Sequence, residues 1–187
     1  LTQNTEGTWH LPAEESARAL DVHDQTVVLL AMKTDDTFDA MEQHSSMYRD
    51  LPVVCCQNGV TNEEWLFARG YKTYGCTVMV GAEITHPGTV RHSGGKLLEI
   101  GNWPSGSDDI SRSLVSDLEA SGMDASVDER VIDGKWGKLV RNLANAYLAL
   151  TDLSVQEASC DPRDRQFMAD VNEEAADVLE AAEISAR

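Results

Sequence analysis

Two continuous apolar segments, each followed by a polar turn, restrict the fold of this chain more than any other feature. Residues 26–32 and 53–57 are apolar at almost every position and rich in valine and leucine. Such runs are typical of strands that are covered on both faces of a sheet. Helical patterns follow, over roughly 36–48 and after Thr61. The repeated order of strand, polar loop and helix predicts a doubly wound α/β sheet.

The two predicted helices also have start signals. Thr34 or Asp35 is available to cap the first helix, because short polar side chains bind the free N–H groups of a first turn. Thr61 and Glu64 have the spacing of a capping box at the start of the second.

The rest of the chain divides into an antiparallel part and a helical part. The elements expected are a hairpin over 74–84 and 89–92, a further strand over 96–100, a helix over 108–121, a short strand near 124–128, and helices over 131–150 and 162–186. We therefore place a domain boundary near residue 129, between a sheet domain (1–129) and the beginning of an all-helical domain (130–187).

Composition excludes several classes of function. The 187 residues carry a net charge of −17, from 32 acidic and 15 basic side chains, which argues against binding to nucleic acids or anionic membranes. The four cysteines lack metal-ligand spacing, so we expect no metal and reduced thiols in a cytoplasmic protein. No apolar run of 18 residues and no secretory leader is present, so neither a membrane span nor export is expected.

One face of the predicted helix over 131–150 combines a cation with two amides. Lys138, Asn142 and Asn145 lie within about 60° of one another on an ideal helix. An ammonium flanked by amides is a plausible receptor for a small anion with a carbonyl oxygen, although a merely solvated face is the alternative. A separate apolar stripe, which includes Leu143 and Leu150, is expected to be buried.

Two further polar residues directly follow the predicted parallel strands. Ligands of open α/β sheets bind outside the carboxyl ends of the strands, and Lys33 and Asn58 occupy such positions. Lys33 could contact a phosphate or a ribose, or it could be an ordinary loop lysine. Asn58 could bind a ligand, or Asn58-Gly59 could be a turn that requires a positive φ.

Four segments in this order resemble the ketopantoate reductase family, the NADPH-dependent 2-dehydropantoate 2-reductases. They are the strand that ends in Lys33, the turn over 57–60, the hairpin over 75–92, and the helix with Trp136-Gly137-Lys138-Leu139 and Asn142. The resemblance runs from about residue 6 to the end of the chain. It implies a partial Rossmann-like, dinucleotide-binding domain, followed by a partial catalytic and substrate domain like the C-terminal domain of 6-phosphogluconate dehydrogenase.

The resemblance also implies roles for individual residues. Lys138 matches the family's general acid, which protonates the carbonyl oxygen as hydride reaches the carbon. Asn142 matches a substrate-binding amide, and Asn58 lies near both substrate and cofactor. Lys33 and Gly81 match positions that contact the NADPH cofactor. The expected reaction is the reduction of a 2-oxo acid, with 2-dehydropantoate as the first candidate.

Three departures from the family pattern qualify this expectation. Ala146 stands where the family has its second helix amide, so Asn145 could have taken over that role or the substrate could differ. The glycine-rich loop expected to bind pyrophosphate would precede Leu1, and later site residues would follow Arg187. We therefore expect an incomplete site with little activity in this fragment alone.

Two alternatives and one partner remain open from the sequence. The chain could reduce another carbonyl compound, or it could be a non-catalytic nucleotide-binding protein of the same fold. The apolar positions of the last helix could pack within their own domain or against a second copy, which would make a homodimer.

Overall fold

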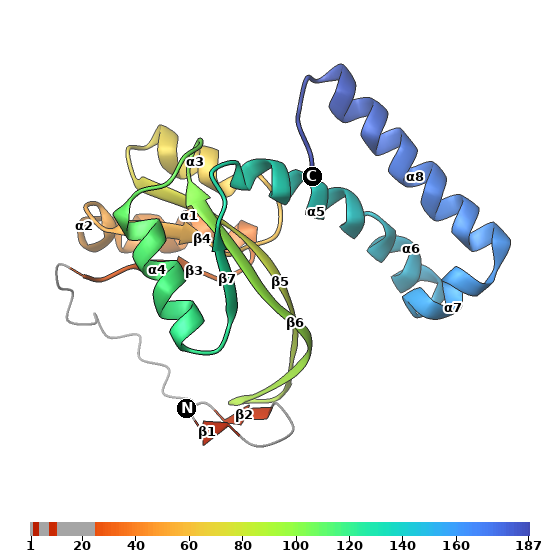
Figure 1. Cartoon of the computed structure of the whole chain (residues 1–187), viewed down its shortest axis with the longest axis horizontal. Coiled ribbons are helices and arrows are strands. Elements are labelled where there is room, and N and C mark those ends of the chain that lie inside the picture. The colour runs from red at the N-terminus through yellow and green to blue at the C-terminus, as the bar shows by residue number, and fades with distance from the viewer. Residues whose placement is uncertain (1, 4–7, 11–24) are drawn as a thin grey trace.

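The computed structural model describes residues 2–3, 8–10 and 25–187, so part of the predicted first domain (1, 4–7 and 11–24) lies outside the described residues (Figure 1). The strands are β1 (Thr2–Gln3), β2 (Thr8–His10), β3 (Val28–Leu30), β4 (Pro52–Cys55), β5 (Lys72–His86), β6 (Thr89–Asn102) and β7 (Asp124–Val127). The helices are α1 (Thr34–Gln43), α2 (Ser45–Tyr48), α3 (Asn62–Ala68), α4 (Asp109–Ala120), α5 (Val131–Asn142), α6 (Ala144–Thr151), α7 (Val155–Cys160) and α8 (Pro162–Ala181).

A single mixed sheet organises the first part of the chain. Its order is β1-β2-β6-β5-β4-β3, and β7 pairs with β6 beside this path. β3, β4 and β5 are parallel neighbours, whereas β5 and β6 form a long antiparallel hairpin. The parallel strands bring the ends of β3 and β4 to one edge, where the sequence predicts a ligand site.

The sheet is covered on both faces, as the apolar runs predict. Alternate residues of β4 enter two different core clusters: Val53 and Cys55 pack with α1 and α3, whereas Val54 packs with α4. Cys55 and Cys56 likewise point to opposite faces, because successive side chains alternate across a strand. All four cysteines are free thiols.

The predicted caps of the first two helices are wrong. α1 begins at Thr34, so Thr34 and Asp35 lie inside its first turn and Lys33 occupies the cap without a side-chain bond. Thr61 is the cap of α3, but its φ of −101° and ψ of −25° are helical and it makes no side-chain cap bond. A capping side chain needs an extended backbone at that residue, so the predicted box with Glu64 does not form.

The hairpin is longer than the sequence predicts. The segments expected as two separate strands, 89–92 and 96–100, form the single strand β6, which pairs with β5 over most of its length. Two residues between them, Gly94 and Gly95, have positive φ, which glycine adopts without strain, so the strand passes through an irregularity without ending.

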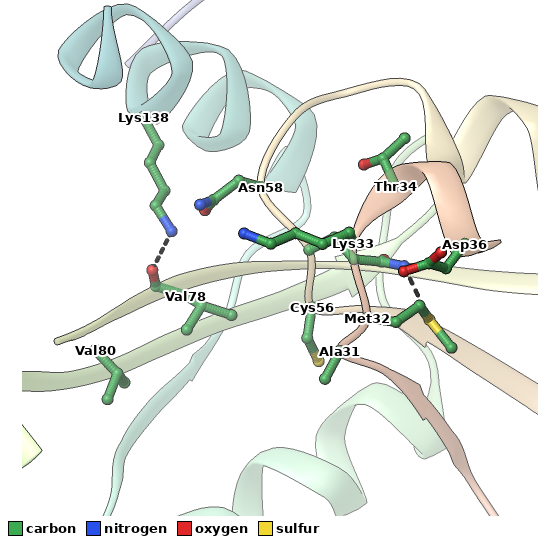
Figure 2. A pocket seen from close by; sticks show the side chains of 11 residues that line it. Ala31, Met32, Lys33, Thr34, Asp36, Cys56, Asn58, Val78, Val80 and Lys138 are labelled. Carbon is green, nitrogen blue, oxygen red and sulfur yellow. Dashed lines mark hydrogen bonds between the residues drawn. The ribbon is translucent and has the colours of Figure 1, made fainter. Parts of the chain in front are cut away.

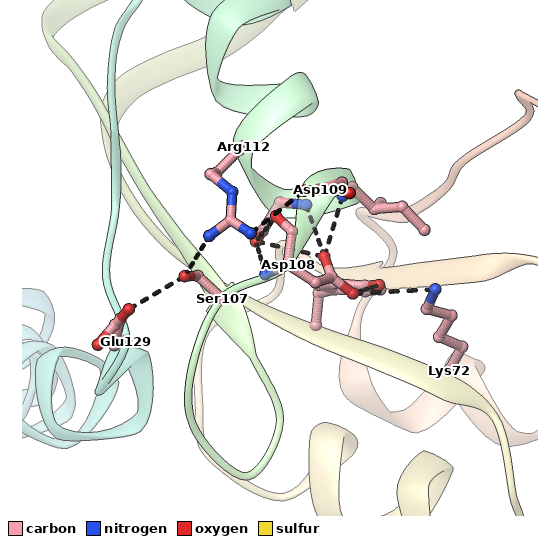
Figure 3. Close-up of polar contacts among 9 residues, drawn as sticks. Lys72, Ser107, Asp108, Asp109, Arg112 and Glu129 are labelled. Atoms are coloured by element: carbon pink, nitrogen blue, oxygen red, sulfur yellow. Dashed lines mark hydrogen bonds and ion pairs between the residues drawn. The ribbon is translucent and has the colours of Figure 1, made fainter.

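A polar cluster fixes the start of α4 (Figure 3). Asp108 Oδ1 accepts hydrogen bonds from the backbone N–H groups of Ile110 and Ser111, each at 3.0 Å, while Tyr74 Oη donates to Asp108 Oδ2 at 2.8 Å. Lys72 lies 3.8 Å from the same oxygen. Burial opposes ionisation of Asp108, but these bonds and the nearby ammonium outweigh it and lower its pKa. The predicted helix over 108–121 and the strand that follows it are confirmed.

After residue 130, α5 packs against β5 and β6, and α6, α7 and α8 extend away from the sheet (Figure 1). The single helix predicted over 131–150 is instead α5 and α6, separated at Leu143, whose N–H bonds to the carbonyl of Val140 rather than one residue earlier. The predicted burial of its apolar stripe holds only in part: Trp136 and Leu139 are half-buried, whereas Leu143 is 39% and Leu150 87% exposed. Among the described helices, none is long and apolar enough to cross a membrane.

Candidate functional site

A pocket of about 540 Å³ lies at the carboxyl ends of β3 and β4. Its wall includes Lys33 after β3, Asn58 after β4, Val78 and Val80 of β5, and Lys138 of α5 (Figure 2). Segments far apart in sequence therefore converge on one cavity. Three of the predicted site residues, Lys33, Asn58 and Lys138, lie in its wall.

Lys33 reaches the pocket because β3 ends just before it. The residue is exposed and stands in an extended conformation at the start of α1, with φ −64° and ψ 150°. Its side chain and that of Lys138 extend from opposite walls into the same space (Figure 2). Asp36 also lines the cavity, so the two ammonium groups and this carboxylate leave its lining with a net positive charge. Such a lining favours an anion, which matters in a chain with a net charge of −17.

Asn58 is presented by a turn that other residues hold in place. Gly59 has a φ of +89°, so the glycine satisfies the positive φ that the Asn-Gly pair predicts. The preceding residue, Gln57, is buried and donates from Nε2 to Thr37 Oγ1 at 2.9 Å. The two readings of the Asn-Gly pair are therefore compatible: it forms a turn, and the turn places Asn58 in the pocket wall.

Lys138 is half-buried, and its Nζ donates to the carbonyl oxygen of Val78 on β5. An ammonium has three N–H donors, of which Val78 accepts one. Burial lowers the pKa of Lys138, and the positive charges of Lys135 and Arg141 lower it further, whereas Cys76 acts in the opposite direction. A lysine with a lowered pKa beside a cavity gives up its proton more readily than an ordinary lysine, which suits it to proton transfer.

A buried ion pair, which the sequence did not reveal as a site, lies beneath this lysine. Lys135 and Glu63 pair directly, and their side chains are only 4% and 1% exposed. Lys135 Nζ also donates to the carbonyl of Gln57 at 3.1 Å and to that of Cys55 at 3.5 Å. Burial raises the pKa of Glu63, while the charge and hydrogen bond of Lys135 act to lower it.

One sequence signal could have pointed to this contact. Gly134 and Gly137 lie inside α5, where each glycine costs about 1 kcal/mol relative to alanine. A Cβ on Gly134 would lie 3.1 Å from Thr77 Oγ1 of β5. A glycine inside a helix therefore indicates that a neighbouring segment approaches closely.

The other predicted site residues do not line the pocket. Asn142 is the last residue of α5, and Asn145 lies in α6 and is exposed. The break at Leu143 interrupts the ideal helix on which their common face was predicted. Gly81 follows the pocket residue Val80, and a Cβ there would lie 2.8 Å from Ser93 Oγ across the hairpin. Gly81 is therefore closely packed within the hairpin, against Ser93 and the backbone of Gly94.

The donors around the pocket fit a nicotinamide dinucleotide with an anionic substrate. Lys33 and Lys138 supply positive charge, and the Asn58 amide supplies both a donor and an acceptor. The position outside the ends of parallel strands is where open α/β sheets bind dinucleotides. Within the described residues, no group of three or more histidine, cysteine or acidic side chains is arranged to hold a metal ion.

Comparison with known sequences identifies related proteins. Residues 1–105 match the family model described as Ketopantoate reductase PanE/ApbA. A 2-dehydropantoate 2-reductase from Pyrococcus horikoshii is 28% identical over 144 residues, which are 77% of this chain and 45% of the relative. The chain thus spans about half the length of the curated relatives it matches.

Solved structures give the same fold. A PanE/ApbA family ketopantoate reductase from Ralstonia eutropha superposes with a TM-score of 0.75 at 27% identity, covering 86% of this chain and 53% of that one. D-mandelate dehydrogenase in a ternary structure with NADH and anilino(oxo)acetate superposes with a TM-score of 0.76 at 22% identity, covering 89% and 55%. The second likeness concerns the fold alone. The partial Rossmann-like sheet followed by helices is therefore confirmed.

Proposed function

We propose, from the premise that this chain belongs to the ketopantoate reductase family, that its protein reduces a 2-oxo acid with NADPH. The observation that carries the proposal is the convergence of Lys33, Asn58 and Lys138 on one pocket at the carboxyl ends of β3 and β4. We take 2-dehydropantoate as the first candidate substrate, as in the curated relatives, and a cytoplasmic location.

In this proposal, Lys138 is the general acid. When bound, a reduced nicotinamide supplies the hydride that the carbonyl carbon receives. The Lys138 ammonium points at the carbonyl oxygen, polarises the C=O bond and transfers a proton from Nζ to that oxygen, so that a 2-hydroxy acid leaves. Its lowered pKa makes this transfer easier, and Val78 O holds the ammonium until substrate arrives.

In the same proposal, Lys33 and Asn58 bind and orient the cofactor and the substrate. The Lys33 ammonium would attract a phosphate of the cofactor. The Asn58 amide would contact cofactor and substrate from the turn after β4. Asn142 and Asn145 remain proposed substrate contacts from the end of α5 and the start of α6, and Gly81 a proposed backbone contact to the cofactor.

Another 2-oxo acid is the second candidate substrate. Ala146 stands where the resemblance implies a second amide, and a solved neighbour of this fold is a D-mandelate dehydrogenase. A non-catalytic nucleotide-binding protein would have no need of a half-buried lysine in the pocket wall.

The test is oxidation of NADPH and of NADH by the product of the complete gene, followed at 340 nm with a panel of 2-oxo acids. The panel includes 2-dehydropantoate and benzoylformate, the oxo acid that corresponds to mandelate. We expect turnover with NADPH and the highest kcat/KM for 2-dehydropantoate. Preference for benzoylformate would select the second candidate, and no turnover with any acid would refute the reductase.

A further inference from the structure

The buried pair of Lys135 and Glu63 requires an explanation beyond stability. Two ions with side chains 4% and 1% exposed have lost nearly all their hydration. Replacement of such a pair by apolar residues often leaves a protein equally stable, so its contribution to stability alone is a weak reason for its presence. Its location is more informative, because it joins the helix that carries Lys138 to the strand end that borders the pocket.

Three contacts fasten α5 at this point. Lys135 pairs with Glu63 of α3, and its Nζ also donates to the backbone carbonyls of Gln57 and Cys55 at the end of β4. Those carbonyls belong to the segment that leads directly into Asn58. One ammonium therefore links α5, α3 and the strand end at a single point.

The helix lies so close to the sheet that a glycine is needed beneath it. A Cβ on Gly75 of β5 would lie 2.9 Å from Val131 Cγ1 and 3.6 Å from Glu63 Oε1. Lys138 is three residues after Lys135, on the next turn of α5, so both side chains lie on neighbouring parts of the helix surface. Any shift of α5 at Lys135 would move the Lys138 ammonium relative to the pocket.

We propose that the buried Lys135–Glu63 pair positions Lys138, by fastening α5 to the end of β4 so that the Lys138 ammonium stays in the pocket wall. The inference rests on the proposed function, because it assigns the pair to the same reaction. Neither member lines the pocket, so both are positioning residues rather than catalytic ones.

The charge of Lys135 has a second effect on Lys138. Charged or titratable groups around Lys138 are Lys135 and Arg141 on its own helix, Cys76 on β5, and Lys33, Asp36 and Cys56 on the other walls of the pocket. Burial is the main cause of the lowered pKa of Lys138, and the charge of Lys135 is the next. Loss of Lys135 should therefore raise that pKa and keep the general acid protonated to higher pH.

The experiment compares Lys135→Met with Lys96→Met in the product of the complete gene. Lys96 is an exposed lysine of β6 that pairs with Asp124 at 3.8 Å and does not line the pocket, so its removal deletes the same charge outside the pocket wall. We expect Lys135→Met to lower kcat on the order of 10- to 100-fold, as a small misplacement of a reacting group does. The pH at which its kcat/KM begins to decline should also be higher than in the wild type. Lys96→Met should change neither kcat nor the pH profile. Wild-type kcat and pH profile in folded Lys135→Met would overturn the proposal.

A second variant covers failure to fold. Lys135→Met with Glu63→Gln removes both charges and leaves no unpaired ion, so it should fold even where the single variant does not. The same loss of kcat and the same displaced pH profile are expected from it, and wild-type values in both would overturn the proposal.

One further measurement separates this proposal from the proposed function. The pKa of the Lys138 ammonium is followed by NMR in protein labelled with ¹⁵N-lysine, with its signal assigned from Lys138→Arg. If the wild type reduces no 2-oxo acid, the reductase proposal fails. A higher pKa of Lys138 in the Lys135 variants would still support the proposal that Lys135 acts on Lys138. An unchanged pKa in that case would overturn the positioning proposal as well.

Discussion

Removal of Lys135 should destabilise the protein in a pH-dependent manner. In Lys135→Met, the Glu63 side chain, which is 1% exposed, would stay buried but lose its ion-pair partner. One of its oxygens, Oε2, already has no hydrogen-bond partner among the described residues. Because a lone buried carboxylate is so costly, Glu63 should bind a proton in the folded state instead of remaining ionised.

The size of the loss follows from that proton. Protonation of a carboxyl with an unfolded pKa of about 4.3 costs about 1.4 kcal/mol per pH unit, which sets an upper limit of about 3.7 kcal/mol at pH 7 and about 1 kcal/mol at pH 5. The loss relative to the wild type is smaller than this limit, because burial already raises the pKa of Glu63 in the wild type. The sign is that of a group whose folded pKa is raised: stability is retained below the unfolded pKa and lost as pH rises. Breaking a buried pair costs about 3–5 kcal/mol in general, a range that includes the upper limit at pH 7.

Urea unfolding of wild type, Lys135→Met and Lys96→Met at pH 5 and pH 7 measures this loss. The exposed Lys96 pair should contribute less than about 1 kcal/mol at either pH. An equal loss for Lys135→Met at both pH values would refute the reasoning, because Glu63 would then not exchange a proton on unfolding.

Three other predictions concern the cap of α4, the thiols and the substrate amide. Asp108→Ala should lower the free energy of unfolding by about 1–2 kcal/mol at pH 7. Because the pKa of Asp108 is lowered in the folded state, this loss should shrink below about pH 4. A loss of the same size in acid would contradict this prediction. NADPH should slow maleimide labelling of Cys56, because Cys56 lines the pocket and its hydrogen bond with Cys76 lowers the pKa of its thiol. Labelling of the exposed Cys160 should be unaffected. Equal protection of both thiols, measured by peptide mass spectrometry, would argue against the cofactor site. Asn142→Ala should raise KM for the 2-oxo acid about tenfold with kcat nearly unchanged, and an unchanged KM would remove Asn142 from the site.

The fold was predictable where local pattern and packing agree. The apolar runs that become β3 and β4 are covered on both faces, as continuous apolarity indicates. The helix predicted over 108–121 also formed, and Asp108 caps it because its backbone is extended there, with φ −136° and ψ −173°. The cap predicted at Thr61 failed because that residue has helical backbone angles, which the sequence does not specify.

The site was predictable in part for the same reason. Lys33 and Asn58 follow strands whose ends must meet at one edge, so topology alone brings them together. Lys135 and Glu63 are 72 residues apart in sequence, and although the glycines beside Lys135 indicate that another element approaches α5 closely, they do not specify which one. Their pairing depends on how α5 crosses β5, which is a property of tertiary packing. Asn145 shows the converse, because an ideal helix placed it beside Lys138 and the break at Leu143 interrupts that helix.

The central claim is that the Lys138 ammonium donates the proton in a reduction of a 2-oxo acid. The most direct test is kcat/KM for NADPH-dependent reduction of 2-dehydropantoate by wild type and Lys138→Met, with Lys96→Met as the matched loss of an exposed lysine. Loss of a general acid should lower kcat/KM by about 10²- to 10⁴-fold, while Lys96→Met retains the wild-type value. A folded Lys138→Met protein with kcat/KM within about twofold of wild type would contradict the account.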